Sequence, residues 1–194
     1  MAGGKLIVIA APSGCGKTTI AKAILALYPE MLFSVSATTR TMRAGEVHGK
    51  DYFFLSKEEF EERIRMKDLV EWEEIYGNYY GTLKSEIQRA LEQGRVMLFD
   101  VDVKGALSIR NHFTADAVLI FIRPPSSEVL QKRLENRKTE DPETLKRRLD
   151  RVPMELAQGS KFDYQVVNDD LQKAINEVHA IVQKTLTSTI HSHS

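Results

Sequence analysis

Leu6-Ile-Val-Ile-Ala-Ala-Pro-Ser-Gly-Cys-Gly-Lys-Thr18 joins an apolar run to a glycine-containing loop. Residues 6–11 are apolar at every position, which is typical of a parallel strand buried on both faces. Residues 18–27 are rich in Ala, Ile and Leu and predict a helix that stops near Pro29. Strand, loop and helix in this order form the context of a phosphate-binding loop, or P-loop.

The P-loop predicts where the phosphates of ATP bind. Gly14 and Gly16 allow backbone amides to turn toward phosphate oxygens without a Cβ clash. Lys17 supplies a full charge to the β- and γ-phosphates, and the Thr18 hydroxyl is placed to bind Mg²⁺. Ala11 stands where the pattern has its first Gly, and we expect no loss of function from this small replacement. The predicted ATP phosphate site comprises Ala11, Pro12, Ser13, Gly14, Cys15, Gly16, Lys17 and Thr18.

The rest of the chain alternates strands with helices. Further strands are predicted at 96–99, 117–122 and 164–167, and further helices near 105–112, 126–137, 142–157 and 171–186. This alternation favours a three-layer α/β fold with a mostly parallel sheet. The segment from about 33 to 82 breaks the rhythm, with a strand at 52–55 and a capping-box helix from Ser56 to about Lys67.

We therefore expect one P-loop core with an insertion. The core takes residues 1–34 and 83–190 and includes a helical lid at about 126–157. Residues 35–82 form an inserted α+β substrate module, and 191–194 are a loose tail.

Composition excludes several classes of protein. The 194 residues balance 27 Lys+Arg against 27 Asp+Glu, which argues against binding nucleic acid through an overall positive field. A single cysteine, Cys15, excludes an intrachain disulfide framework and a cysteine zinc cluster, and we expect it to do no chemistry. No apolar run reaches the ~18 residues of a membrane span, and the N-terminal stretch lacks a signal-peptide layout. We expect a cytoplasmic protein without membrane contact.

Two carboxylates follow the predicted strand at 96–99. Asp100 and Asp102 are spaced i, i+2, which would put both on one face of the strand. At the carboxyl end of a strand beside a P-loop, a carboxylate is placed to hold hydrated Mg²⁺. We therefore expect Asp100 to bind the metal through water, together with Thr18.

The inserted module carries groups suited to a nucleoside monophosphate. Arg40, Arg43 and Tyr52 can bind a phosphate monoester by charge-assisted hydrogen bonds. Glu71 is a natural reader of guanine, which presents two adjacent donors, N1–H and N2–H₂. Adenine lacks this pair and would leave buried groups unpaired.

At this density of motifs the sequence resembles the guanylate kinase family. The resemblance rests on the P-loop, the run from Ser36 to Tyr52, Gly77-Asn-Tyr-Tyr-Gly-Thr82, the Asp100-Val-Asp102 strand and the stretch Phe162–Asp170, and it covers nearly all of residues 4–184. It implies transfer of the γ-phosphoryl group of ATP to GMP, and to dGMP as well, with Mg²⁺ bound alongside ATP. No nucleic-acid, membrane or obligate protein partner is expected.

The resemblance also assigns roles to residues. It implies that guanine contacts Ser36, Glu71, Thr82 and Asp102, and that the GMP phosphate contacts Arg40, Arg43, Tyr52 and Tyr80. The lid arginines that meet the ATP phosphates would be Arg137 and Arg148, so the catalytic set becomes Lys17, Arg40, Arg137 and Arg148. Asn136 replaces a usual Gly, and Pro153 lies where the following helix is usually regular. We expect the neighbouring Lys138, Arg147 and Arg151 to be surface charges.

Two alternatives share this fold. A guanylate-kinase-like scaffold domain would bind a phosphopeptide on the GMP face, but the intact Lys17, Thr18 and Asp100 and both lid arginines argue against it. A sugar-phosphate kinase is disfavoured by Ser36, Glu71 and Thr82. A nucleic-acid binder is the least favoured alternative, because the aromatic residues cluster with Gly and carboxylates.

Overall fold

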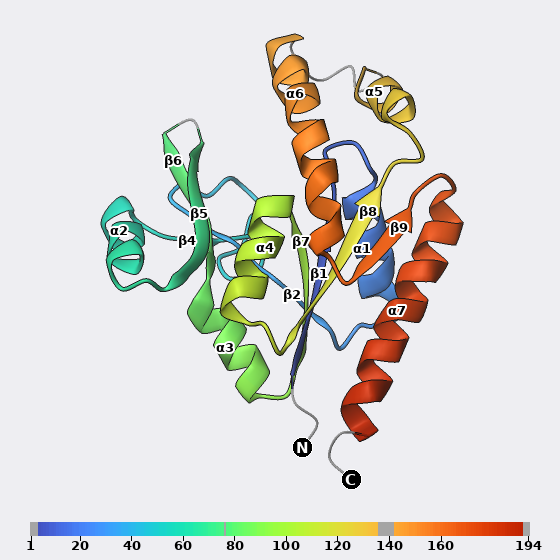
Figure 1. The fold of residues 1–194 in the computed structure, drawn as a ribbon. Coiled ribbons are helices and arrows are strands. Elements are labelled where there is room, and N and C mark those ends of the chain that lie inside the picture. The colour runs from blue at the N-terminus through green and yellow to red at the C-terminus, as the bar shows by residue number, and fades with distance from the viewer. Residues whose placement is uncertain (1–3, 76, 136–141, 192–194) are drawn as a thin grey trace.

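The central sheet is built from five parallel strands in the order β2-β7-β1-β8-β9 (Figure 1). The computed structural model describes residues 4–75, 77–135 and 142–191. The strands are β1 (Lys5–Ala10), β2 (Leu32–Phe33), β7 (Val96–Val101), β8 (Ala117–Arg123) and β9 (Tyr164–Val167). Strand β1 buries Ile7 and Ile9 in one core cluster and Leu6 and Val8 in another, on opposite faces. The predicted parallel strand with two buried faces is confirmed.

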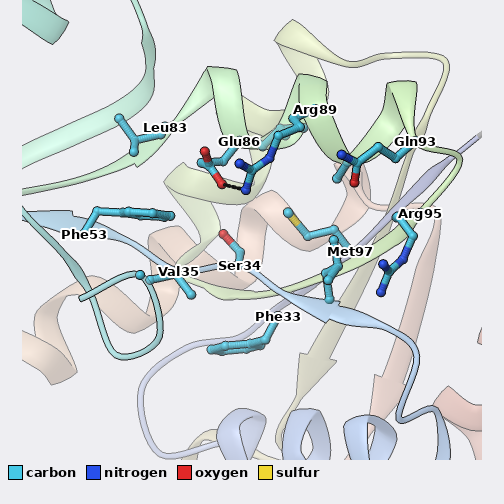
Figure 2. Close-up of a pocket in the computed structure, with 14 residues that line it drawn as sticks. Phe33, Ser34, Val35, Phe53, Leu83, Glu86, Arg89, Gln93, Arg95 and Met97 are labelled. Carbon is cyan, nitrogen blue, oxygen red and sulfur yellow. Dashed lines mark hydrogen bonds and ion pairs between the residues drawn. The ribbon is translucent and has the colours of Figure 1, made fainter. Parts of the chain in front are cut away.

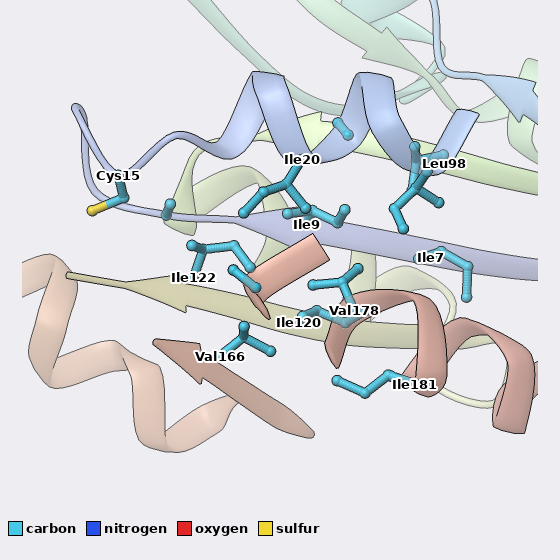
Figure 3. Packing of buried hydrophobic residues seen from close by; sticks show 14 of the residues in the cluster. Ile7, Ile9, Cys15, Ile20, Leu98, Ile120, Ile122, Val166, Val178 and Ile181 are labelled. Carbon is cyan, nitrogen blue, oxygen red and sulfur yellow. The ribbon is translucent and has the colours of Figure 1, made fainter. Parts of the chain in front are cut away.

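Helices cover both faces of this sheet. Helices α1 (Lys17–Leu27) and α7 (Leu171–His191) pack on one face, where Ile20, Ile24 and Val178 are fully buried (Figure 3). Helices α3 (Lys84–Glu92) and α4 (Val103–His112) pack on the other face. The result is the predicted three-layer α/β fold, with the P-loop at the carboxyl end of β1.

Two further helices lie beyond the carboxyl ends of the strands, α5 (Ser127–Glu135) and α6 (Pro142–Gln158) (Figure 1). Helix α6 continues through Pro153 and is followed by a short 3-10 turn, η1 (Gly159–Lys161). The buried side chain of Val152 anchors α6 to the core cluster that contains Cys15 and Leu134. This contact places one face of α6 over the P-loop.

The inserted segment forms its own sheet, ordered β4-β3-β6-β5. Its elements are β3 (Ala37–Thr38), β4 (Phe53–Phe54), α2 (Lys57–Arg65), β5 (Leu69–Ile75) and β6 (Asn78–Leu83). A small core joins α2 to this sheet through Phe60, Leu69 and Leu83. Ser56 and Glu59 form the predicted capping box at the start of α2.

Several elements differ from the sequence expectation. The antiparallel pair β5–β6 was not predicted, because its alternation is hidden by Glu and Tyr at partly exposed positions. Helix α3 was missed because its N-cap is Leu83, which makes no side-chain cap. Helix α7 continues to His191, beyond the expected end at 186. Across the described ranges, no helix combines the length and apolarity that crossing a membrane requires.

Candidate active site

The P-loop leaves backbone donors available at the start of α1. Gly14 and Gly16 have φ values of 88° and 80°, in the left-handed region that favours glycine. A Cβ on Gly16 would also lie 2.6 Å from Nδ2 of Asn168, so the position has no room for a side chain. Gly16 is the N-cap of α1 and provides no side-chain cap. The first amides of α1 therefore face a cavity of about 180 Å³ lined by residues 12–19, where an anion can bind.

Lys17 forms an ion pair with Asp100 at the end of β7. The pair is largely desolvated, because the exposed fractions of the two side chains are 21% and 10%. Burial lowers the pKa of Lys17 to about 8, and the negative charge of Asp102 opposes this shift. A phosphate approaching Lys17 thus meets an ammonium that has already lost most of its hydration.

Asn168, after the end of β9, ties the P-loop to the sheet. Its Nδ2 donates to the Cys15 carbonyl at 2.8 Å, and its backbone N–H donates to the Arg123 carbonyl at 2.9 Å. Its own carbonyl accepts from Nη1 of Arg133 at 3.0 Å. Asn168 is 5% exposed, so these bonds are shielded from water. We assigned Asn168 no role from the sequence, although it stands within the quoted stretch Phe162–Asp170.

Cys15 is 1% exposed inside the P-loop. Burial raises the pKa of its thiol to about 12 and outweighs the lowering by Arg133. The thiol stays protonated, which agrees with the expectation that Cys15 does no chemistry.

A second cavity, of about 220 Å³, lies between the inserted sheet and the end of β7. Four of the residues expected to bind guanine or the metal line this cavity, namely Ser36, Glu71, Asp100 and Asp102. Tyr80, expected at the GMP phosphate, lines it as well. Asp102 lies beyond β7 as the N-cap of α4 and accepts from the Gly105 amide at 2.7 Å. Asp102 thus lies one residue beyond the strand with an extended backbone, and it lines the same cavity as Asp100.

Glu71 and Thr82 are opposite each other in the β5–β6 pair. The Thr82 hydroxyl donates to Oε1 of Glu71 at 2.8 Å, which fixes the carboxylate and leaves Oε2 for other donors. Burial raises the pKa of Glu71, while the Thr82 hydrogen bond lowers it and the charge of Asp102 adds to the rise. A half-buried carboxylate of this kind suits a ligand that brings its own hydrogen-bond donors.

The residues expected to hold the acceptor phosphate meet around Arg40. Its guanidinium lies 5.3 Å from the ring centre of Tyr52, whose ring centre is 6.2 Å from that of Tyr80. Glu46 accepts from Nη2 of Arg40 at 2.6 Å and from the Arg43 amide at 2.7 Å. The carboxylate of Glu46 thus binds two donors that a phosphate could also use. The sequence assigned no role to Glu46.

These parts form one continuous cleft. A third cavity, of about 290 Å³, is lined by Ala11, Ser13, Lys17, Asp102, Arg151 and Glu155. It shares Ser13 and Lys17 with the P-loop cavity and Asp102 with the cavity around Glu71. Tyr80 then links that cavity to Tyr52 and Arg40. The cleft can therefore hold two phosphate-bearing groups end to end, with Lys17 near their junction.

Arg151 on α6 is exposed, as expected of a surface charge, but it also faces the cleft. It lines the third cavity, and its guanidinium lies 3.8 Å from Asp102 and 3.8 Å from Glu155. Burial raises the pKa of Glu155, which the charge of Arg151 opposes. The basic stretch of α6 was the only sequence signal for Arg151, and it could not show which side of the helix faces the cleft. The expected lid residue Arg137 and the side chain of Arg148 lie outside the described part of the chain.

Comparison with known proteins places the whole chain in one group. A family model described as guanylate kinase matches residues 3–185. The chain is 47% identical over 185 residues to a guanylate kinase of Chlorobium luteolum, covering 95% of this chain and 94% of that protein. It is 50% identical over 184 residues to a guanylate kinase of Salinibacter ruber, covering 94% and 97%.

A solved structure agrees with these relatives. The crystal structure of guanylate kinase from Anaplasma phagocytophilum superposes with a TM-score of 0.69 at 30% sequence identity. The match covers 95% of this chain and 87% of that one.

Proposed function

Because the chain belongs to the guanylate kinase family, we propose that it is an ATP:GMP phosphotransferase that uses the cleft described above. The reaction moves the γ-phosphoryl group of ATP to GMP, giving ADP and GDP. The observation that carries the proposal is the series of adjoining cavities that leads from the P-loop to the half-buried Glu71–Thr82 pair. We propose further that dGMP is also a substrate.

The base-reading end of the cleft selects guanine. Oε2 of Glu71 would accept from the guanine base, with Thr82 holding Oε1. Ser36 and Asp102 line the same cavity and would contact the base edge. Adenine lacks the adjacent pair of donors and would leave the half-buried Glu71 carboxylate unpaired, and this unpaired charge would supply the selectivity.

The phosphate groups meet between the two ends of the cleft. The acceptor oxygen of GMP is already anionic, so no protein general base is needed. Arg40, Arg43, Tyr52 and Tyr80 would hold the acceptor phosphate, with the phosphate displacing Glu46 from Arg40. Lys17 and the P-loop amides would hold the donor phosphates. Arg137 and Arg148 would add positive charge around the transferring phosphoryl group. Catalysis then rests on alignment and on neutralising the transferring group.

Thr18 and Asp100 fit a magnesium site. They offer a hydroxyl and a carboxylate, the oxygen ligands that Mg²⁺ prefers. Among the described residues, no group of three or more His, Cys, Asp and Glu could hold a metal by itself, so water and phosphate oxygens would supply the remaining ligands. When bound, Mg²⁺ would neutralise the negative charge that develops on the phosphate groups, with Thr18 and Asp100 holding it.

The proposed organisation follows from these roles. Residues 35–82 act as the GMP-binding module, residues 126–157 as the lid, and 1–34 with 83–190 as the core. Closure of the module and the lid over both nucleotides would exclude water as a competing acceptor. We propose nucleotides as the partners and the cytoplasm as the location.

An activity panel tests the proposal. ADP formation would be measured with ATP and GMP, AMP, CMP or UMP, and we expect turnover with GMP only. The variant Lys17→Met should lower kcat by at least about 100-fold, because the donor phosphates lose their buried cation. The matched control Lys22→Met changes an exposed lysine of the same helix and should retain activity.

Activity on none of the monophosphates would contradict the proposal and favour the phosphopeptide scaffold. Near-normal activity of Lys17→Met, with its circular dichroism and Tm unchanged, would remove the P-loop from the mechanism.

A further inference from the structure

A fourth cavity, of about 290 Å³, lies behind the inserted module (Figure 2). Phe33, Phe53, Met97, Arg89, Gln93 and Arg95 are among the side chains that line it. It shares no lining residue with the three cavities of the nucleotide cleft. We call it the back cavity.

The back cavity is lined by both segments that connect the core to the module. Ser34 and Val35 lie on the first connection, and Leu83 lies on the second. The next residue after Val35 is Ser36, which lines the base-reading cavity. The residue before Leu83 is Thr82, which holds Glu71. On each connection, a residue that lines the back cavity is therefore directly bonded to a residue of the base-reading site.

The walls of the back cavity combine apolar and aromatic side chains with polar ones. Phe33 is 46% exposed on its floor, although most residues of its size and type are buried. Phe53 lies across from it, and the buried side chain of Met97 lies between Phe33 and α3 (Figure 2). A flat apolar molecule could cover these surfaces.

One cation at the rim is available to a ligand. Arg89 is already paired with Glu86, at 2.5 Å. Arg95 donates to the backbone carbonyl of Glu30 at 2.9 Å, and within the described ranges no carboxylate pairs with it. Figure 2 shows Arg95 at the opposite end of the cavity from Phe53. A ligand that complements this cavity would be an apolar ring with a single carboxylate at one end, which Arg95 could bind.

We propose that the back cavity binds a small aromatic carboxylate, and that its occupation weakens GMP binding. An occupant that contacts both connections restrains them in the arrangement that the structure shows. GMP binding requires the module to close over the base, so the two ligands oppose each other, and each weakens the other by the same factor. This coupling rests on the proposed function, whereas the site itself does not.

The site is tested with 2-naphthoate as the probe and the full chain free of nucleotides. Titration by calorimetry or amide NMR should give saturable binding with a Kd on the order of 0.1–1 mM, as expected for a ligand of this size. Arg95→Gln should weaken the probe about fivefold or more, because it removes the carboxylate partner. Gln93→Trp places a large ring at the exposed rim and should abolish binding. The control Arg65→Gln changes an exposed arginine of α2 and should leave the Kd unchanged.

Two results would overturn the site. One is the absence of saturable binding by the unmodified chain, and the other is binding that neither Arg95→Gln nor Gln93→Trp alters. Arg95 and Gln93 lie outside the nucleotide cleft, so both variants should keep basal activity with ATP and GMP.

The coupling is tested by measuring the Kd of GMP with and without saturating 2-naphthoate. We expect the Kd of GMP to rise about fivefold and the Kd of ATP to change less than twofold, in line with ordinary coupling energies. An unchanged GMP affinity in a chain that binds the probe would overturn the coupling. A chain that binds no GMP would contradict the proposed function, and the probe titration would still decide the site.

Discussion

At the scale of single residues, we propose that the Glu71 carboxylate decides which base the cleft accepts. It is half-buried, bonded to Thr82 on one oxygen and near a second carboxylate, Asp102. Such a group is costly to desolvate unless a ligand supplies donors. On this proposal, selectivity for guanine would follow from the cost of leaving Glu71 unpaired.

The first prediction concerns Glu71→Gln. Glutamine turns an NH₂ donor or a single neutral oxygen toward the two donors of guanine, so kcat/KM for GMP should fall about 10- to 100-fold, the equivalent of a lost charged hydrogen bond. The GMP-over-AMP ratio should shrink accordingly. Glu74→Gln on the exposed part of β5 is the matched control. An unchanged ratio would show that Glu71 does not read the base.

The second prediction concerns pH. The pKa of Glu71 is raised by burial, so its carboxylate becomes protonated at a higher pH than the ordinary value of about 4.3. Protonated Glu71 cannot accept from both guanine donors. GMP affinity should therefore be full above the raised pKa and fall as pH drops through it. Measuring the Kd of GMP against pH checks this, and Glu71→Gln should flatten the acid limb.

At the scale of elements, the position of the P-loop depends on β9 as well as on β1 and α1. The Asn168 side chain bridges from the end of β9 to the Cys15 carbonyl in a buried setting. The same side chain occupies the space that a Cβ on Gly16 would need. Two segments far apart in sequence thus fix one loop.

The third prediction is that Asn168→Ala loosens the P-loop. It leaves the buried Cys15 carbonyl without its donor, which should cost about 1–3 kcal/mol of stability. The KM for ATP should rise more than the KM for GMP, because the loop binds the donor phosphates. Urea unfolding and steady-state kinetics measure these effects. Asn176→Ala, at an exposed position of α7, is the control, and equal changes in both KM values would contradict the prediction.

At the scale of the whole molecule, the cleft lies between the core, the inserted module and α6. Its charges come from all three parts, with Lys17 and Asp100 in the core, Arg40 in the module and Arg151 on α6. The balance of 27 basic and 27 acidic residues therefore hides a local separation of charge. Binding of either nucleotide should stabilise the assembly of these parts.

The fourth prediction is a thermal shift specific to GMP. At about 100 times its Kd, GMP should stabilise the chain by about 2.7 kcal/mol, or roughly 5–10 °C in Tm for a chain of this size. AMP at the same concentration should give no comparable shift. Scanning calorimetry tests this, and the shift should shrink in Glu71→Gln. Equal shifts with GMP and AMP would contradict a guanine-reading site.

The sequence alone determined the fold class, and it predicted the chemistry of the two ends of the cleft. The apolar run at 6–11, Gly14 and Gly16, and Lys17 imply a strand, a loop and a phosphate site, because these demands are local to the backbone. The spacing of Arg40, Arg43 and Glu71 likewise indicated a monophosphate with a guanine base.

Only the tertiary structure decided how these parts meet. Arg151 and Glu155 face Lys17 because Val152 anchors α6 in the core, and a charge pattern along a helix cannot show which side docks. Glu46 binds Arg40 because a loop folds back on itself, and Asn168 reaches Cys15 across the sheet. The back cavity likewise exists only where both connections to the module come together. Local patterns fix elements, whereas contacts between distant segments depend on how those elements pack.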